Sequence, residues 1–180
     1  MDTRKDTELL GSGQYLRLLR RGSWEFAERA NASAAVIVVA VTPEDRILFV
    51  EQYRVPIQSA TIEMPAGLVG DTCDDDTMEK AAARELEEET GWRATHVRML
   101  MSGPSSAGMS NEMIGFARAT GLVRVGAGGG DHTEEIVVHE IPRTEAAAWL
   151  HRKAAEGYSI DPKLYAGLYF VDRNPDGSGC

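Results

Sequence analysis

The chain contains 180 residues, with 28 acidic and 19 basic side chains and a formal net charge of −9 at pH 7. This negative charge disfavours a nucleic-acid partner, because its phosphates would be repelled. Hydrophobic residues make up 43% of the sequence, which is enough to build the core of a single domain. The two cysteines, Cys73 and Cys180, provide neither a disulfide framework nor the spacing of a metal site.

Targeting and membrane segments are not expected. The charged N-terminal residues have no apolar run behind them, and the longest apolar stretch, residues 36–41, has only the length of a strand. The sequence therefore predicts a cytoplasmic protein with no membrane partner.

Strands separated by turns are predicted for the first part of the chain. The first two are expected to form a hairpin that turns at Gly22. The last leads into a loop over residues 67–75 that is rich in glycine and aspartate. The strands expected in this part cover residues 15–21, 23–29, 34–41, 46–53 and 62–65.

A helix is predicted after this loop. Asp76 is expected to cap its N-terminus, with Glu79 in a capping-box relation. Gly91 is expected to end the helix. The side chains that should be buried share a spacing of four residues: Met78, Ala82 and Leu86.

The rest of the chain predicts three more strands and then two helices. The second of these helices should start at Asp161 and Pro162, a capping residue followed by proline. Only residues 176–180 are expected to lack fixed structure. The strands are predicted at residues 97–101, 112–119 and 135–141, and the other helix at 144–156, ended by Gly157.

The end of the first predicted helix, residues 84–92, is its most informative part. At about 100° per residue, Glu85, Glu88 and Glu89 share one narrow face. Neighbouring carboxylates repel each other, and a divalent cation with oxygen ligands would offset that repulsion. The alternative is an acidic face in contact with solvent.

These nine residues resemble the second half of the Nudix box, Arg-Glu-U-x-Glu-Glu-x-Gly-U, where U is a bulky apolar residue. Leu86 and Trp92 occupy the U positions. Upstream, residues 63–69 resemble the segment that opens the box in the ADP-ribose pyrophosphatase branch. The resemblance implies an α/β fold, a Nudix-type α/β/α sandwich with a mixed sheet at residues 33–175, preceded by an N-terminal β arm at residues 1–32.

The first half of the box departs from the family pattern. The family places a glycine 14 residues before the arginine and a glutamate 8 residues before it, which are the positions of Gly70 and Asp76. The glycine of Pro-Ala-Gly, Gly67, lies 17 residues before Arg84. Either the loop carries three extra residues, or Gly70 is the box glycine and Asp76 replaces the glutamate. The insertion is favoured, because loops tolerate added residues.

The resemblance also implies a metal site that binds Mg²⁺, with Mn²⁺ as an alternative. Its main ligands would be Glu85 and Glu89, with the carbonyl oxygen of Ala66 as a third and Glu88 shared or bridging. Arg84 would orient a ligand carboxylate through a charge-assisted pair.

A glycine-rich segment, residues 126–135, corresponds to the late loop on which this branch carries a further acidic residue. Glu134 aligns with that metal ligand or base. His132 lies where relatives carry the proposed general base, and a histidine can act as one near neutral pH. The base is therefore Glu134 or His132, with Glu134 preferred.

Substrate contacts are implied in three segments. Residues 105–112 resemble the family's Ser-Pro-Gly-x-Ser-x-Glu loop, but Ala107 stands where the proline typical of ADP-ribose hydrolysis is expected. In relatives an aromatic side chain of the N-terminal arm stacks on adenine; the alternative is ordinary packing across a hairpin. The residues implied are Trp24 and Phe26 of the arm, Arg54, Glu63, Ser110 and Glu112.

The function implied is hydrolysis of the diphosphate bond of ADP-ribose or a related nucleoside diphosphate sugar, giving a nucleoside monophosphate and a sugar phosphate. The loss of the proline marker favours a broader sugar range than ADP-ribose alone. The alternative is a non-catalytic sensor that binds such a nucleotide. A homodimer that exchanges its N-terminal arms is expected, with no nucleic-acid partner.

Overall fold

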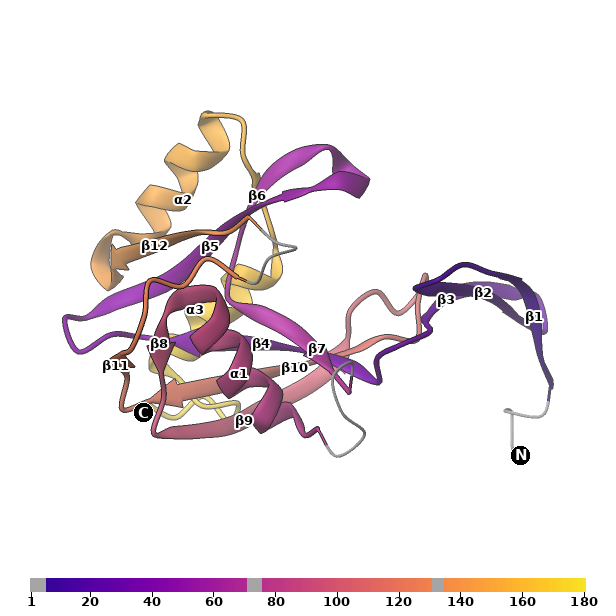
Figure 1. Ribbon diagram of the computed structural model, residues 1–180, viewed down its shortest axis with the longest axis horizontal. Coiled ribbons are helices and arrows are strands. Elements are labelled where there is room, and N and C mark those ends of the chain that lie inside the picture. Colours follow the sequence, from indigo (N-terminus) through magenta and orange to yellow (C-terminus); the bar gives the residue numbers. More distant parts are fainter. Residues whose placement is uncertain (1–5, 71–75, 131–134) are drawn as a thin grey trace.

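The structure is a computed structural model that describes residues 6–70, 76–130 and 135–180 (Figure 1). Two predicted site residues, His132 and Glu134, lie outside the described residues, as does Cys73. In the described part of the chain, no helix is both long enough and apolar enough to cross a membrane.

A four-stranded mixed sheet forms the centre of the domain. Its strand order is β7-β4-β10-β9. The two middle strands run parallel, and each outer strand pairs antiparallel with its neighbour. The strands are β4 (Ala34–Ala40), β7 (Ala66–Val69), β9 (His96–Pro104) and β10 (Met113–Thr120).

A second four-stranded sheet, in the order β12-β5-β6-β13, lies beside the first. Here β6 and β13 run parallel, and the other pairs are antiparallel. Its strands are β5 (Arg46–Arg54), β6 (Ser59–Glu63), β12 (Val137–Pro142) and β13 (Ser159–Ile160). The remaining short elements are β8 (Trp92–Arg93), β11 (Val123–Arg124), η2 (Val55–Ile57) and η3 (Arg143–Glu145).

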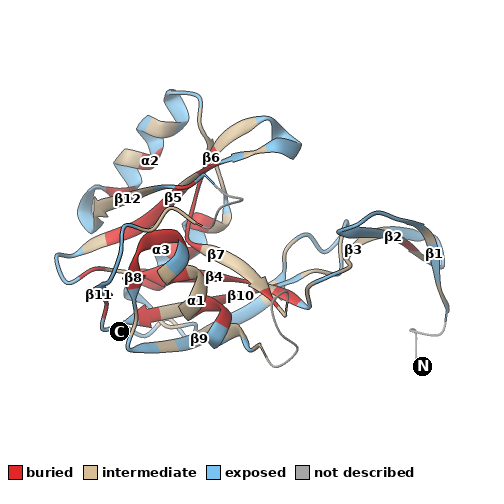
Figure 2. Ribbon diagram, viewed as in Figure 1, coloured by how far each residue is buried: buried red, intermediate tan, exposed pale blue. Residues whose placement is uncertain are grey.

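Helices cover the central sheet, as the predicted α/β/α sandwich requires. The helices are α1 (Met78–Thr90), α2 (Ala146–Ala155) and α3 (Lys163–Asp172). Because side chains alternate along a strand, Val36 and Val38 of β4 join the core cluster that contains α1, whereas Ile37 and Val39 join the cluster that contains α2 and α3. Figure 2 shows the buried residues concentrated between these layers.

The N-terminal arm is a three-stranded sheet that extends away from the sandwich (Figure 1). Its strands are β1 (Thr7–Ser12), β2 (Leu16–Arg21) and β3 (Trp24–Arg29). The predicted hairpin is confirmed, and Gly22 at its turn has a φ of +60°, which glycine adopts without steric cost. The strand β1 was not predicted.

The segment before α1 differs from the prediction in two ways. Residues 66–69, of which most were expected in a loop, form β7, because their backbone pairs with β4. The N-cap of α1 is Thr77, whose hydroxyl oxygen accepts a hydrogen bond from the Lys80 N–H at 3.3 Å, and not Asp76. The carboxylate of Asp76 is instead engaged with Arg84 and the Gly70 N–H. The predicted end at Gly91 is confirmed.

The prediction that residues 176–180 lack fixed structure is wrong. The carboxylate of Asp176 accepts hydrogen bonds from the backbone N–H and the hydroxyl of Ser178, at 2.9 and 2.6 Å. Gly179 forms a β-bridge with Arg173. A short turn closed by an aspartate therefore holds the C-terminus against the end of α3.

Candidate active site

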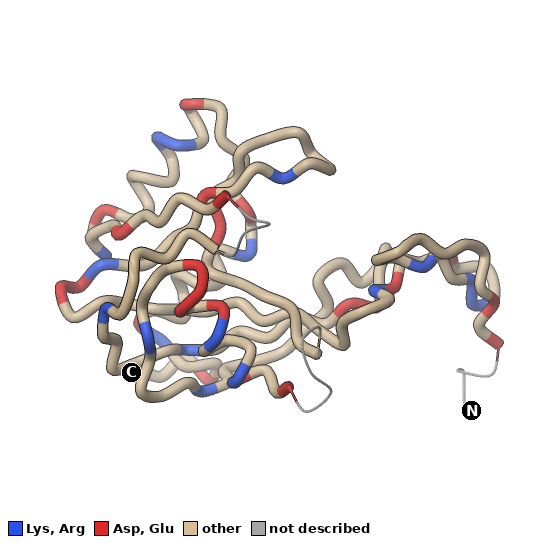
Figure 3. Tube along the Cα trace, viewed as in Figure 1, with Lys and Arg blue, Asp and Glu red and all other residues tan. Residues whose placement is uncertain are grey.

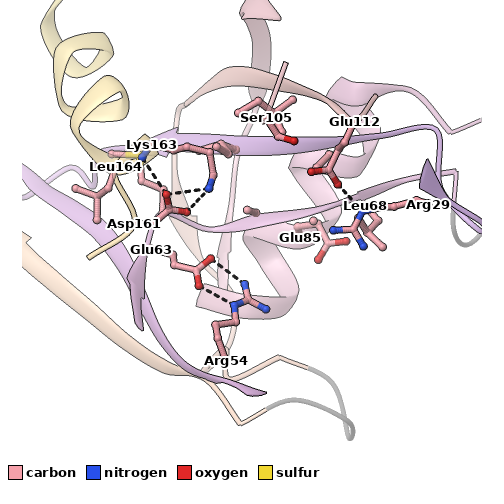
Figure 4. A pocket seen from close by; sticks show the side chains of 16 residues that line it. Arg29, Arg54, Glu63, Leu68, Glu85, Ser105, Glu112, Asp161, Lys163 and Leu164 are labelled. Carbon is pink, nitrogen blue, oxygen red and sulfur yellow. Dashed lines mark hydrogen bonds and ion pairs between the residues drawn. The ribbon is translucent and has the colours of Figure 1, made fainter. Parts of the chain in front are cut away.

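A cavity of about 490 Å³ opens between the arm, the central sheet, α1 and the start of α3 (Figure 4). Charged side chains of both signs line it, and they come from six different parts of the chain. Met64, Ile114 and Leu164 add apolar surface. The charged residues on its wall are Arg29, Arg54, Glu63, Glu85, Glu112, Asp161 and Lys163.

The acidic end of α1 approaches this cavity along β7. Figure 3 shows the acidic residues gathered towards the C-terminal part of that helix. Glu85 lies directly against Gly67, where an added Cβ would come within 1.9 Å of the Glu85 carboxyl carbon. A side chain at position 67 would displace the Glu85 carboxylate, so glycine leaves room for that carboxylate beside β7.

The three glutamates on the predicted face have different surroundings. Glu85 has a side chain 12% exposed and lies on the cavity wall, whereas the Glu88 side chain is 50% exposed and is not part of that wall. Glu89 is 1% exposed and accepts hydrogen bonds from the Ala66 N–H at 3.0 Å and the Gln52 amide at 3.3 Å. Two of the three glutamates thus face the first residues of β7.

A metal site was predicted from these residues. Among the residues that the structure describes, no three Asp, Glu, His or Cys side chains lie close enough together to hold a metal ion. Glu134, the remaining predicted ligand, lies outside the described residues. At the start of β7, the Glu89 carboxylate accepts the Ala66 N–H and the Glu85 carboxylate lies against Gly67. Carboxylate oxygens are ligands suited to Mg²⁺ or Mn²⁺.

Arg84 connects α1 to β7. Its guanidinium donates to the Glu85 carboxylate at 2.7 Å, to the Leu68 carbonyl at 3.2 Å and to the Asp76 carboxylate at 3.4 Å. Features of both box registers are therefore present, because Gly67 makes the close approach to Glu85 while Asp76 is the acidic partner of Arg84. These contacts fix the orientation of the Glu85 carboxylate.

Arg54 and Glu63 form an ion pair at the opposite edge of the cavity. The guanidinium donates two hydrogen bonds to the carboxylate, at 2.6 and 2.8 Å, from adjacent strands β5 and β6. Two parallel charge-assisted bonds of this kind hold both groups in one geometry. The pair therefore fixes the Arg54 guanidinium on the cavity wall.

Arg29 and Glu112 form another pair, which joins the arm to the cavity. Burial would raise the pKa of the Glu112 carboxyl, but hydrogen bonds from Arg29 and Ser105 and the positive charges of Arg29 and Lys163 outweigh it and hold that pKa below its ordinary value. Ser110, which was also predicted to contact substrate, is hydrogen-bonded to Ser105 at 3.2 Å.

The two aromatic residues of the arm do not reach the cavity of their own chain. Trp24 pairs with Arg21 at the β2–β3 turn, at the far end of the strand from Arg29. The central guanidinium carbon of Arg21 lies over the Phe26 ring, 5.3 Å from the centre of that ring. Neither side chain lines the cavity, so a contact with substrate would require a second copy of the chain.

Sequence reasoning missed several residues of this site. Arg29 was treated only as the end of a hairpin strand, and Asp161 only as a helix cap. Lys163 carried no signal, because a lysine in the first turn of a helix is usually solvated. Their pocket positions depend on pairing between segments far apart in the sequence, which no local pattern reveals.

Comparisons with known proteins place these observations in context. A family model described as "NUDIX domain" matches residues 32–166. The "Methanol dehydrogenase activator" of Bacillus methanolicus is 34% identical over 154 residues, which cover 82% of this chain and 82% of that protein. The "ADP-ribose pyrophosphatase" of Mycobacterium tuberculosis is 32% identical over 138 residues, covering 76% and 64% of the two chains. The "Crystal structure of ADP compounds hydrolase" has the same fold, with a TM-score of 0.70 at 17% identity and coverage of 92% and 89%.

Proposed function

The chain belongs to the NUDIX domain family and is a Nudix pyrophosphohydrolase, and we propose that its substrates are ADP-ribose and related nucleoside diphosphate sugars. Hydrolysis of the diphosphate bond would give a nucleoside monophosphate and a sugar phosphate. The related proteins include the "ADP-ribose pyrophosphatase" of Mycobacterium tuberculosis and a "GDP-mannose pyrophosphatase" of Citrobacter koseri, and these names support this substrate class.

One observation carries the proposal. The cavity places Glu85, at the end of the acidic helix, on the same wall as two arginine–glutamate pairs, Arg29–Glu112 and Arg54–Glu63. A diphosphate is an anion that needs positive charge nearby, and the chain as a whole has a net charge of −9. A divalent cation bound by Glu85, together with these arginines, would offset the repulsion that such a substrate would meet.

The residues at the start of β7 suit a divalent cation. Glu85 and Glu89, with the Ala66 carbonyl, would hold Mg²⁺ or Mn²⁺, with Glu88 available from the same helix. When bound there, such an ion neutralises phosphate charge and makes water a stronger nucleophile near neutral pH. Arg84 keeps the Glu85 carboxylate in place through its 2.7 Å contact.

Phosphate binding and proton removal would depend on other side chains. Arg54, fixed by Glu63, is in position to donate hydrogen bonds to a phosphate oxygen. The proton of the attacking water would be taken by Glu134, with His132 as the alternative base; both stay predictions. The test compares pH–rate profiles of Glu134→Gln and His132→Ala: loss of the base should reduce turnover by about 10²–10⁴-fold and remove the acidic limb of the profile.

We also propose that the protein is a homodimer built through the arm, residues 1–32. Leu9, Leu16, Leu18 and Trp24 are large apolar side chains that the arm leaves exposed. Exchange of the arms would cover them and could bring the partner's aromatic residues to the nucleotide base. The remaining domain would comprise residues 33–175.

The experiment is a substrate panel of ADP-ribose, ADP-glucose, GDP-mannose and UDP-glucose, with Mg²⁺ or Mn²⁺ and chromatographic separation of the products. We expect at least one member to yield a nucleoside monophosphate and a sugar phosphate. Omitting the metal should abolish the reaction. Release of inorganic phosphate alone, or no cleavage of any member, would reject the proposal.

A sensor or activator function is the second candidate. It is supported by the relative whose match covers 82% of both chains, since that protein's name describes an activator of another enzyme. Tight binding of ADP-ribose without cleavage of any member of the panel would favour this function. Retention of Glu85, Glu88 and Glu89 favours the hydrolase.

A further inference from the structure

Asp161 and Lys163 lie at the start of α3, on a part of the cavity wall to which the proposed hydrolysis assigns no substrate contact. Strand β13 brings them there by pairing parallel to β6, with Ile160 opposite Ile62. The N–H of Asp161 continues this pairing by donating to the Ile62 carbonyl at 3.1 Å. Asp161 therefore lies level with Glu63, which is the next residue of β6.

The two side chains form a fixed pair. The ammonium of Lys163 lies 2.8 Å from Oδ1 and 2.6 Å from Oδ2 of Asp161, and Oδ1 also accepts the backbone N–H of Lys163 at 2.9 Å. The Asp161 side chain is 13% exposed and that of Lys163 is 41% exposed. The carboxylate is thus anchored, whereas the ammonium remains accessible from the cavity.

The pair offers different chemistry from the rest of the wall. An ammonium held against a carboxylate presents little net charge, so it is a weak anchor for a phosphate. Together the two groups offer a donor and an acceptor, which is what neighbouring hydroxyl groups require. Leu164 and Met64 line the same part of the cavity but are buried, so the exposed chemistry there is that of the pair.

The position of the pair agrees with this chemistry. Figure 4 shows Asp161 and Lys163 across the cavity from Arg29 and Glu112, the pair that joins the arm. Glu85 lies beside the Arg29 and Glu112 end of the cavity, and Arg54 lies next to Glu63 at the lower edge of the view. A diphosphate held beside Glu85 would leave the Asp161 and Lys163 end to one of its two substituents.

We propose that Asp161 and Lys163 bind hydroxyl groups of the sugar that leaves as sugar phosphate and contribute to the choice between sugars. This proposal rests on the hydrolysis proposed above. The pair acts on binding and not on the reacting atoms. Its loss should therefore change KM, and the ratio of kcat/KM between two sugar substrates, more than it changes kcat.

The test compares Lys163→Met and Asp161→Asn with the unmodified protein, using ADP-ribose and ADP-glucose. Asparagine keeps a side-chain oxygen that can accept the Lys163 N–H, as Asp161 does. Lys80→Met, an exposed lysine of α1 outside the cavity, is the matched control. We expect both pocket variants to raise KM about 10-fold, as loss of a hydrogen bond to a charged group does, with kcat within about 3-fold. The ratio of kcat/KM between the two sugars should change, and the control should match the unmodified protein.

A phosphate contact by Lys163 predicts a different pattern. Asp161→Asn would then free the ammonium and lower KM, and Lys163→Met would weaken inhibition by inorganic pyrophosphate. Our proposal predicts a higher KM for both variants and unchanged pyrophosphate inhibition. The phosphate pattern, or two variants with unchanged KM and sugar preference, would overturn it.

A binding measurement separates this proposal from the proposed reaction. If the unmodified protein cleaves no member of the panel, the hydrolase proposal fails, and calorimetry with ribose 5-phosphate still tests the pair. Binding that weakens about 10-fold in both variants, but not in Lys80→Met, supports the sugar site. No binding of ribose 5-phosphate to the unmodified protein, or equal binding by all variants, overturns it.

Discussion

The arm and the α1–β4 core use similar apolar strand residues with opposite outcomes. In the core, Val36 and Leu86 are fully buried, whereas Leu16 and Trp24 of the arm are 52% and 66% exposed. The core strand has a helix layer on each face, while the arm extends away from both layers (Figure 2). An apolar strand therefore indicates that a covering surface is needed, but does not say whether the same chain provides it.

The two regions meet at the cavity. The N–H of Ala27 in β3 donates to the Met109 carbonyl at 2.8 Å, and the Asn111 N–H donates to the Ala27 carbonyl at 3.3 Å. Next to these two backbone hydrogen bonds, Arg29 pairs with Glu112 on the cavity wall. A change in the position of the arm would therefore move Arg29 relative to Glu112 on the cavity wall.

The largest difference between the two regions should be seen in folding stability. Leu86→Ala removes a fully buried side chain of α1, and we expect it to lower the free energy of unfolding by about 2–5 kcal/mol. Leu16→Ala in the arm should change it by less than about 0.5 kcal/mol when the protein is monomeric. Urea unfolding at two protein concentrations measures both. Equal losses would mean that the arm is as well packed as the core.

The next effect concerns activity in the core region. Glu85→Gln should reduce turnover by at least about 10²-fold with little loss of folding, because it removes the charge of the proposed metal ligand on the cavity wall. Glu87→Gln is the control on the same helix, since Glu87 pairs with Arg93 and lies outside the cavity. Circular dichroism would verify the folding of both variants. Full activity of Glu85→Gln at saturating Mg²⁺ would refute the assignment.

A smaller effect should come from the arm. Replacing Leu18 by alanine should raise the dimer dissociation constant about 10- to 100-fold, because one large apolar side chain contributes about 1.5–3 kcal/mol when buried. Light scattering across a concentration series measures it. A fully active monomer of the unmodified protein at micromolar concentration would show that the arm is not a dimer contact.

The smallest effect should be the pH dependence of the stability contributed by the Arg29–Glu112 pair. The pKa of Glu112 is lowered from its ordinary value of 4.5, so the Arg29 pair stabilises the fold at pH values above the unfolded-state pKa. This contribution is lost as the pH falls through the lower, folded-state pKa. The melting temperature of the unmodified protein should therefore exceed that of Glu112→Gln near pH 7, and the difference should shrink below about pH 4. A difference that grows on acidification would contradict the pairing.

Much of the architecture was predictable because it is encoded locally. The spacing of Ala82 and Leu86 placed the buried side of α1, and both side chains are fully buried. Gly22 and Gly91 marked a turn and a helix end, and both have positive φ. The strand β7 was missed because it contains few local strand signals and forms through pairing with β4.

The candidate site was less predictable, for a related reason. Helical spacing placed Glu85, Glu88 and Glu89 on one face, but it could not show that β7 passes closest to Glu85 and Glu89 and leaves Glu88 half exposed. Arg54 and Glu63 came from a resemblance to relatives, and their adjacency follows from the pairing of β5 with β6. The roles of all these residues stay predictions.

By itself the sequence determined the acidic helix, its glycine end, the order of the longer strands and helices, and the family to which they belong. These features depend on residue type and short spacing, which folding does not alter. Only the tertiary structure decided that Gly67 admits the Glu85 carboxylate, that Arg29 of the arm reaches the cavity, and that Asp161 lies beside Glu63. Such neighbours arise from sheet pairing and layer packing between distant segments, because the free energy of burying the whole core, and not any local preference, selects them.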